Sequence, residues 1–90
     1  PIGMLDDAAY DDVVLTLDPG DRLYFYTDGV IEALDADEVE FGHVRLLDAI
    51  ACRRDQPLRT GLEAVAADVR AWCGGRLRDD VSLLALERTR

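Results

Sequence analysis

The spacing of apolar residues in the first third of the chain predicts two short strands joined by a turn. Val13, Leu15 and Leu17 alternate along one face, and Leu23 and Phe25 resume the alternation after "DPGD". Proline followed by glycine suits the two central positions of a type II turn, because proline presets φ and glycine accepts the positive φ that comes next. We therefore expect an antiparallel hairpin.

The next stretch predicts an acidic connection followed by a helix. Residues 30–40 show neither a period of two nor one of 3.6, so we expect an acidic surface loop or a short irregular helix. Residues 41–54 regain helical spacing. One side of this helix is expected to carry Val44, Leu47 and Ala51, flanked by Leu46 and Ile50.

A second helix and a last strand complete the pattern. The helix has one apolar stripe with spacings of four, three, four and three: Leu58, Leu62, Val65, Val69 and Trp72. Gly74 and Gly75 supply its end, and Trp72 is expected to pack in the core rather than to bind a ligand. Residues 81–87 are almost continuously apolar, which predicts a strand covered on both faces. The fold class is therefore α+β.

Charge and length narrow the possible partners. The formal net charge is −9, with 19 acidic residues against 10 basic ones, which disfavours nucleic acid and anionic membranes. An acidic protein of this kind can instead need divalent cations. No apolar run approaches 18 residues and no basic segment precedes an apolar one, so we expect neither a membrane span nor a secretory signal, and a cytoplasmic protein fits.

The cysteines and the histidine predict no site of their own. Cys52 and Cys73 lie in different predicted helices at apolar positions and lack CxxC spacing, so buried free thiols are favoured over a disulfide or a zinc site. His43 stands alone and is expected at a helix start or on the surface rather than as a ligand or catalytic base.

Two aspartates occupy more informative positions. Asp28 directly follows the second strand, and Asp79 lies just before the last one, 51 positions later (79 − 28). If the last strand runs antiparallel to residues 23–27, its beginning meets the end of that strand and the two carboxylates converge. Like charges this close repel by about 1 to 4 kcal/mol, so they need a cation, a shared proton or separation. Oxygen ligands favour magnesium or manganese, although aspartates in "TDG" and "DD" also serve as turn formers and solvated caps.

The order of the motifs adds a resemblance. "GDRLYFYTDGVIEA", then "FGHVRLLDAI", then "VRAWCGGRLRDDVSLLAL" resemble the carboxy-terminal half of the SpoIIE-like phosphatases, in the metal-dependent protein phosphatase 2C (PPM) superfamily. The likeness covers nearly the whole chain, and "TDGV" followed by "DDVS" is its most specific part. It implies part of an α-β-β-α sandwich that holds two manganese or magnesium ions at the edge between its sheets.

Roles for single residues follow from this resemblance. Asp28 and Asp79 match two aspartates that bind the same ion. Gly29 would let the chain turn after the ligand, and Asp80 would make either a water-mediated contact or a hydrogen bond that orients its loop, or would be solvent-exposed. The family's amino-terminal metal-binding aspartate and glycine have no match here, so residues 1–90 are expected to be a partial domain with weak metal affinity and negligible catalysis alone.

The resemblance also implies a reaction and partners. A metal-activated water would hydrolyse phosphoserine or phosphothreonine, without a covalent nucleophile, on a regulatory protein such as an anti-sigma-factor antagonist. Sensory domains are commonly attached to such phosphatases. Two other readings stay open, a noncatalytic phosphatase-like module that binds a regulatory partner and a structural fragment whose acids only solvate the surface. An uncovered strand edge and apolar sheet face also predict a homodimer or strand-exchanged assembly.

Overall fold

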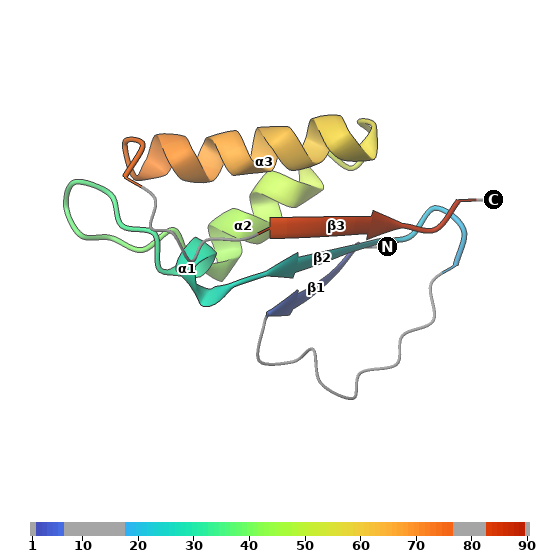
Figure 1. Cartoon of the computed structure of the whole chain (residues 1–90), viewed down its shortest axis with the longest axis horizontal. Coiled ribbons are helices and arrows are strands. Elements are labelled where there is room, and N and C mark those ends of the chain that lie inside the picture. The colour runs from blue at the N-terminus through green and yellow to red at the C-terminus, as the bar shows by residue number, and fades with distance from the viewer. Residues whose placement is uncertain (1, 7–17, 77–82, 90) are drawn as a thin grey trace.

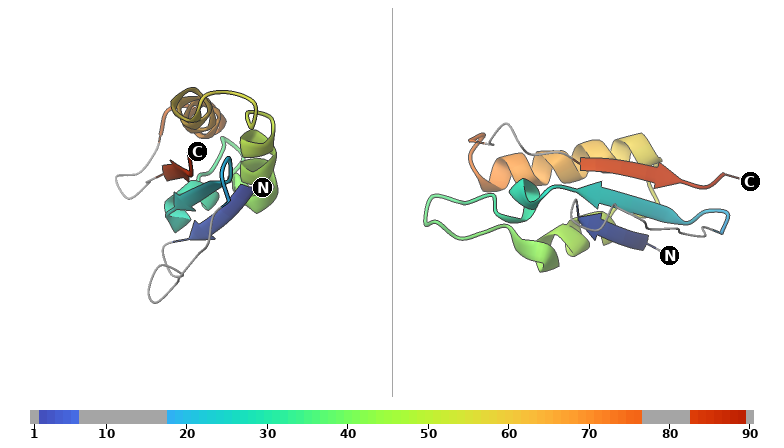
Figure 2. Two further views of the ribbon diagram at one scale, coloured as in Figure 1. Left: turned by 90° about the vertical axis from the view of Figure 1, so that its right-hand side faces the viewer. Right: turned by 60° about the horizontal axis from the view of Figure 1, so that its bottom comes forward.

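The fold has two layers, with helices on one face of a small mixed sheet (Figure 1). The computed structural model describes residues 2–6, 18–76 and 83–89. Its strands are β1 (Ile2–Asp6), β2 (Arg22–Tyr26) and β3 (Leu83–Glu87). Its helices are α1 (Asp28–Ile31), α2 (Gly42–Ala51) and α3 (Leu58–Trp72). Figure 2 shows α2 and α3 on the same side of the sheet, which confirms the expected α+β class.

The sheet has the strand order β1-β2-β3. β3 runs antiparallel to β2, with Tyr26 opposite Leu83 and Arg22 opposite Glu87, as the sequence predicts for the last strand. β1, which the apolar pattern did not reveal, runs parallel to β2. The carboxyl end of β2 therefore lies beside the beginning of β3.

The predicted type II turn is present, but it does not give β2 the expected partner. The amide of Asp21 donates to the carbonyl of Asp18 at 2.9 Å, and Gly20 has φ 89°. The Asp18 amide donates to the Asp21 carboxylate, which lowers the pKa of that carboxyl. The other arm of the expected hairpin, residues 13–17, lies outside the described residues. Both edges of β2 are already paired, so its antiparallel partner is β3.

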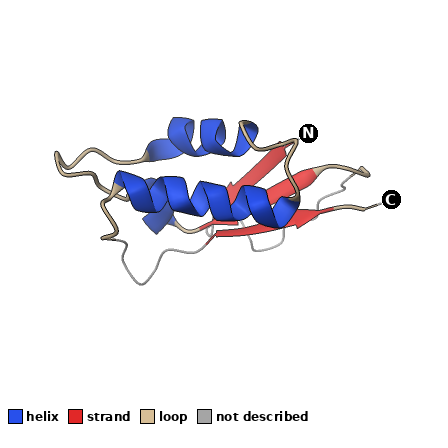
Figure 3. Ribbon diagram, turned by 90° about the horizontal axis from the view of Figure 1, so that it is seen from above, coloured by secondary structure: helices blue, strands red, loops and turns tan. Residues whose placement is uncertain are grey.

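The core lies between the sheet and the two long helices (Figure 3). Tyr24 and Tyr26 of β2 and Ala85 of β3 face this layer, because alternate residues of a strand share a face. Helix α3 buries Val65 and Val69 there, and the partly buried Leu58, Leu62 and Trp72 pack against the core, which confirms the predicted stripe. The helix ends before Gly74 and Gly75, whose φ values are 63° and 82°.

Helix α2 turns a different face inward from the one that its spacing suggested. Leu46, Ala49 and Ile50 are buried, whereas Val44 is 73% and Leu47 48% exposed. Two apolar stripes run along this short helix, and only contact with α1, α3 and the sheet selects between them. The interpretation that placed Val44 and Leu47 on the principal side is therefore corrected.

The described residues cover strand β3 on one face only, contrary to the prediction. Ala85 is buried under the helices, whereas Leu84 is 56% and Leu86 47% exposed. These two leucines lie on the other face, opposite Phe25 and Leu23 of β2. No described helix covers that face, so the apolar run reflects a surface that the described elements leave open.

The predictions for single aromatic and sulfur-containing residues are mostly confirmed. The indole of Trp72 packs edge-on against Phe41, donates to the Val39 carbonyl at 3.0 Å and lies under the Arg45 guanidinium. His43 is exposed in the first turn of α2. Both cysteines are free thiols, and Cys73 is buried. Cys52 is exposed, which corrects that prediction, because it follows the last turn of α2.

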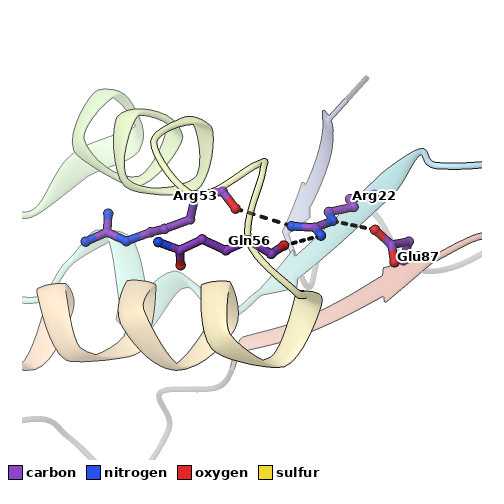
Figure 4. A network of polar contacts seen from close by, with 4 residues as sticks. All are labelled: Arg22, Arg53, Gln56 and Glu87. Carbon is purple, nitrogen blue, oxygen red and sulfur yellow. Dashed lines mark hydrogen bonds and ion pairs between the residues drawn. The ribbon is translucent and has the colours of Figure 1, made fainter.

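A buried arginine joins the sheet to the connection between α2 and α3 (Figure 4). The Nε of Arg22 donates to the Glu87 carboxylate at 2.6 Å, and its two terminal nitrogens donate to the carbonyls of Arg53, at 3.4 Å, and Gln56. The hydrogen bond to Glu87 raises the pKa of Arg22. The guanidinium therefore keeps its charge although Arg22 is only 8% exposed.

The neighbouring Tyr24 carries a polar atom that is poorly satisfied. Its side chain is fully buried and its phenol oxygen has no hydrogen-bond partner within the described part of the chain. A buried hydroxyl without a partner costs about 1 to 3 kcal/mol, so Tyr24→Phe should leave the melting temperature unchanged or raise it by a few degrees. Calorimetry checks this expectation. A clear drop in the melting temperature would mean that the phenol takes part in a hydrogen bond.

Helices α1, α2 and α3 are all shorter than a bilayer-spanning segment, so the described part of the chain contains no candidate membrane span.

Candidate functional site

The candidate site lies where β2 ends and α1 begins. The chain leaves the buried strand at Tyr26, passes through Thr27 in extended conformation, and enters a one-turn helix at Asp28. The amide of Val30 donates to the Thr27 carbonyl at 3.0 Å, and that of Glu32 to the Asp28 carbonyl at 2.9 Å. These two bonds fix the backbone on both sides of the Asp28 side chain.

Buried residues before and after Asp28 fix its position in the chain. Tyr26 precedes it in the core, and Val30 and Ile31 follow in the core. Asp28 itself is exposed, and its carboxylate makes no hydrogen bond or ion pair within the described part of the chain. The result is a carboxylate on a rigid support with its oxygens free to bind a ligand.

The strand register places the first residue of β3 beside the last residue of β2. Leu83, the first residue of β3, pairs with Tyr26, two positions before Asp28. The antiparallel arrangement that the convergence of Asp28 and Asp79 depends on is therefore present. Asp79 and Asp80 themselves lie outside the described residues, so their convergence with Asp28 stays a prediction.

Gly29 differs in detail from its expected role. It is the second residue of α1 and has helical backbone, so it does not use the left-handed conformation that only glycine adopts easily. The backbone conformation at this position therefore does not require glycine.

An acidic stretch follows the site in sequence. From Asp28 to Glu40 there are several acidic residues and no basic one: Asp28, Glu32, Asp35, Asp37, Glu38 and Glu40. Asp35 is held by the loop, since its Oδ1 accepts from the amides of Asp37 and Val39, each at 2.9 Å. A concentration of negative charge beside Asp28 favours approach of cations.

The described residues fit a hard divalent cation only in part. A free carboxylate is the ligand type that magnesium and manganese prefer, and Asp28 provides one. The described residues contain no cluster of three or more side chains able to hold a metal ion. A metal site at Asp28 would therefore need further ligands from beyond the described residues, with Asp79 as the candidate that the sequence suggests.

A groove lies between α2 and α3, and no residue of α1 lines it. Its volume is about 550 Å³, and its lining includes Cys52, Asp48 and Trp72. Its charged groups are largely engaged, since Arg53 pairs with Asp68 at 2.8 Å and Arg45 covers the Trp72 ring.

The sequence reasoning missed the start of α1 at Asp28 and the Arg22 network. A pattern in "RLYFY" indicates the Arg22 network. Arg22, Tyr24 and Tyr26 alternate along the strand, so the arginine lies on the same face as two core residues. Its partner Glu87 lies 65 positions away, beyond the reach of local patterns.

Comparison with known protein families gives a match over nearly the whole chain. A family model described as Stage II sporulation protein E (SpoIIE) matches residues 1–89. The searches of curated proteins and of solved structures gave no match.

Proposed function

The chain belongs to the SpoIIE family, and we propose that it forms the part of a PPM-type phosphatase domain in which Asp28 and Asp79 bind a divalent metal. The family match supports the phosphatase class. The metal, the reaction and the substrate are parts of the proposal.

One observation carries the proposal. Asp28 is an exposed carboxylate without a partner in the described part of the chain, anchored between buried residues at the edge of the sheet where β3 begins. A structural aspartate at a strand end normally caps a helix or closes a turn through its side chain. Asp28 does neither within the described residues, which leaves it available to a ligand.

In this proposal each residue of the site has its own role. Asp28 and Asp79 hold the same ion through carboxylate oxygens, and Gly29 keeps the space beside Asp28 clear. Asp80 orients the loop before β3 or contacts the site through water. The chemistry supplied by bound manganese or magnesium is a water of lowered pKa and neutralisation of charge on the phosphoryl oxygens.

The proposed substrate is a phosphorylated regulatory protein. Phosphoserine or phosphothreonine on an anti-sigma-factor antagonist fits the family, and sensory domains would control the activity. The acidic stretch after Asp28 would repel a phosphoprotein unless bound cations offset its charge, so metal loading would precede productive binding.

Metal-dependent hydrolysis is the direct test. The full-length protein should hydrolyse p-nitrophenyl phosphate when manganese or magnesium is added, and a chelator should return the rate to background. Calcium at the same concentration serves as the control, because it has the same charge but prefers a larger and more flexible ligand shell.

Two outcomes would contradict the proposal. Hydrolysis that persists in chelator would remove the metal from the reaction. Absence of hydrolysis with every metal, for p-nitrophenyl phosphate and for phosphoprotein, would favour the noncatalytic module that binds a regulatory partner.

A further inference from the structure

Helix α1, which carries Asp28, is too short to be stable by itself. It has four residues, and a helix of one turn does not persist in water without tertiary contacts. Val30 and Ile31 supply part of this support by burial in the core. The segment that follows the helix, residues 32–41, supplies more of it and is called the 32–41 loop below.

The 32–41 loop folds back onto the end of α1. The amide of Phe41 donates to the carbonyl of Ala33 at 2.8 Å. The side chain of Phe41 lies in the same buried cluster as Val30 and Ile31. The position of α1 therefore depends on where the returning half of the loop, residues 39–41, is held.

Two side chains from α2 and α3 hold this half through three consecutive carbonyls. The indole Nε1 of Trp72 donates to the Val39 carbonyl at 3.0 Å. The Arg45 guanidinium donates to the carbonyls of Glu40 and Phe41, each at 3.1 Å. Arg45 also lies over the Trp72 ring, 4.2 Å from its centroid, and Phe41 meets that ring edge-on. The two side chains therefore act as one unit, which is called the Arg45–Trp72 clamp below.

The clamp lies at the end of the molecule that carries the candidate site. Figures 1 and 2 show the 32–41 loop, the end of α3 and α1 at this same end. We propose that Trp72 and Arg45 are positioning residues for the metal site, because they hold the 32–41 loop and, through it, α1 and the Asp28 carboxylate. This inference rests on the proposed function, in which Asp28 is a metal ligand. Loss of the clamp should then weaken metal binding although every ligand is still present.

Manganese binding to the full-length protein tests the clamp, with free manganese measured by its electron paramagnetic resonance signal. Trp72→Phe keeps an aromatic ring but removes the N–H group that holds Val39. It should raise the manganese dissociation constant by about tenfold, the lower end of the loss when a residue that orients a metal ligand is replaced. Arg45→Met should raise it by a similar factor. Arg45 is exposed, so this variant decides the test if circular dichroism shows that Trp72→Phe is unfolded.

Arg53→Met is the matched control for a loss of helix packing. Within the described part of the chain, the Arg53 side chain bonds to Asp68 of α3 and to the Ala49 carbonyl of α2, and not to the 32–41 loop. Its replacement should leave the manganese dissociation constant within about twofold of wild type. Urea unfolding of the three variants shows whether manganese affinity merely follows stability, as a purely structural role of the clamp would require.

The outcomes separate this inference from the proposed function. Weaker manganese binding in the clamp variants, with wild-type affinity in Arg53→Met, would support the inference. Wild-type affinity in both clamp variants would overturn it and leave the proposed function standing, as would an equal loss of affinity in Arg53→Met. A wild-type protein that binds no manganese would overturn the proposed function and this inference together.

Discussion

Replacing Asp28 by asparagine should lower metal-dependent phosphatase turnover by at least about 100-fold, the upper end of what loss of an outer partner of a metal ligand costs. Asparagine keeps the size of the side chain but removes the charge that a hard divalent cation requires. Asp28 is exposed and makes no bond within the described residues, so the fold has no need of its carboxylate. The free energy of unfolding should change by less than about 0.5 kcal/mol.

Asp37→Asn is the matched control for this experiment. Asp37 lies in the same acidic stretch and its side chain is exposed, so the substitution removes the same charge from the same region. Its turnover should stay within about twofold of wild type. Equal losses of turnover in the two variants would mean that the negative charge of the whole acidic stretch supports activity. Full activity of Asp28→Asn would mean that the metal binds elsewhere.

A manganese titration separates loss of binding from loss of chemistry. If Asp28 is a ligand, high manganese should recover part of the activity of Asp28→Asn, because weakened affinity is overcome by mass action. Recovery would not follow if the substitution had disturbed substrate binding instead.

The sequence predicted the parts of the fold that local chemistry determines. Proline and glycine at positions 19 and 20 specify the type II turn, the stripe from Leu58 to Trp72 specifies α3, and "TDG" marks the end of β2. In each case the residues that cause the structure lie within a few positions of one another.

Features that depend on contacts between residues far apart in the sequence were not predicted. β1 forms because Ile2–Asp6 pairs in parallel with Arg22–Tyr26. The residues of Ile2–Asp6 alone do not predict that pairing. The buried side of α2 was misread because residues 44, 47 and 51 and residues 46, 49 and 50 have equally helical spacing. The candidate site shares this limit, since Asp28 can be placed from the strand that precedes it whereas its convergence with Asp79 depends on pairing across the sheet.

Arg22→Met should destabilise the protein by about 3 kcal/mol, because each buried group that loses its hydrogen-bond donor costs about 1 to 3 kcal/mol. The substitution takes the donors from the carbonyls of Arg53 and Gln56 and leaves the Glu87 carboxylate unpaired. The Glu87 side chain is 28% exposed, so water replaces part of what it loses, and most of the destabilisation comes from the two carbonyls. Ninety residues typically have a stability of about 5 to 13 kcal/mol, so the loss is a large share of it.

Urea unfolding measures this loss, and Arg59→Met supplies its control. Arg59 is an exposed arginine in the first turn of α3 and forms no ion pair or side-chain hydrogen bond within the described residues, so its replacement should change stability by less than about 0.5 kcal/mol. Arg22→Lys should also destabilise, because one ammonium cannot direct hydrogen bonds to a carboxylate and two carbonyls in the planar geometry of a guanidinium. Wild-type stability of Arg22→Lys would show that charge alone suffices.

The double variant Arg22→Met/Glu87→Leu separates the ion pair from the carbonyl contacts. If most of the energy lies in the pair, removing both partners should recover most of the loss, because no buried charge remains. If it lies in the carbonyls of Arg53 and Gln56, the double variant should stay as unstable as Arg22→Met, and amide hydrogen exchange should be faster in residues 52–56. We expect the second result, since Glu87 keeps access to water at the sheet edge whereas the two carbonyls depend on Arg22 to hold the end of α2 against β2. Slow exchange in residues 52–56 of Arg22→Met would contradict this account of how the helices are fixed to the sheet.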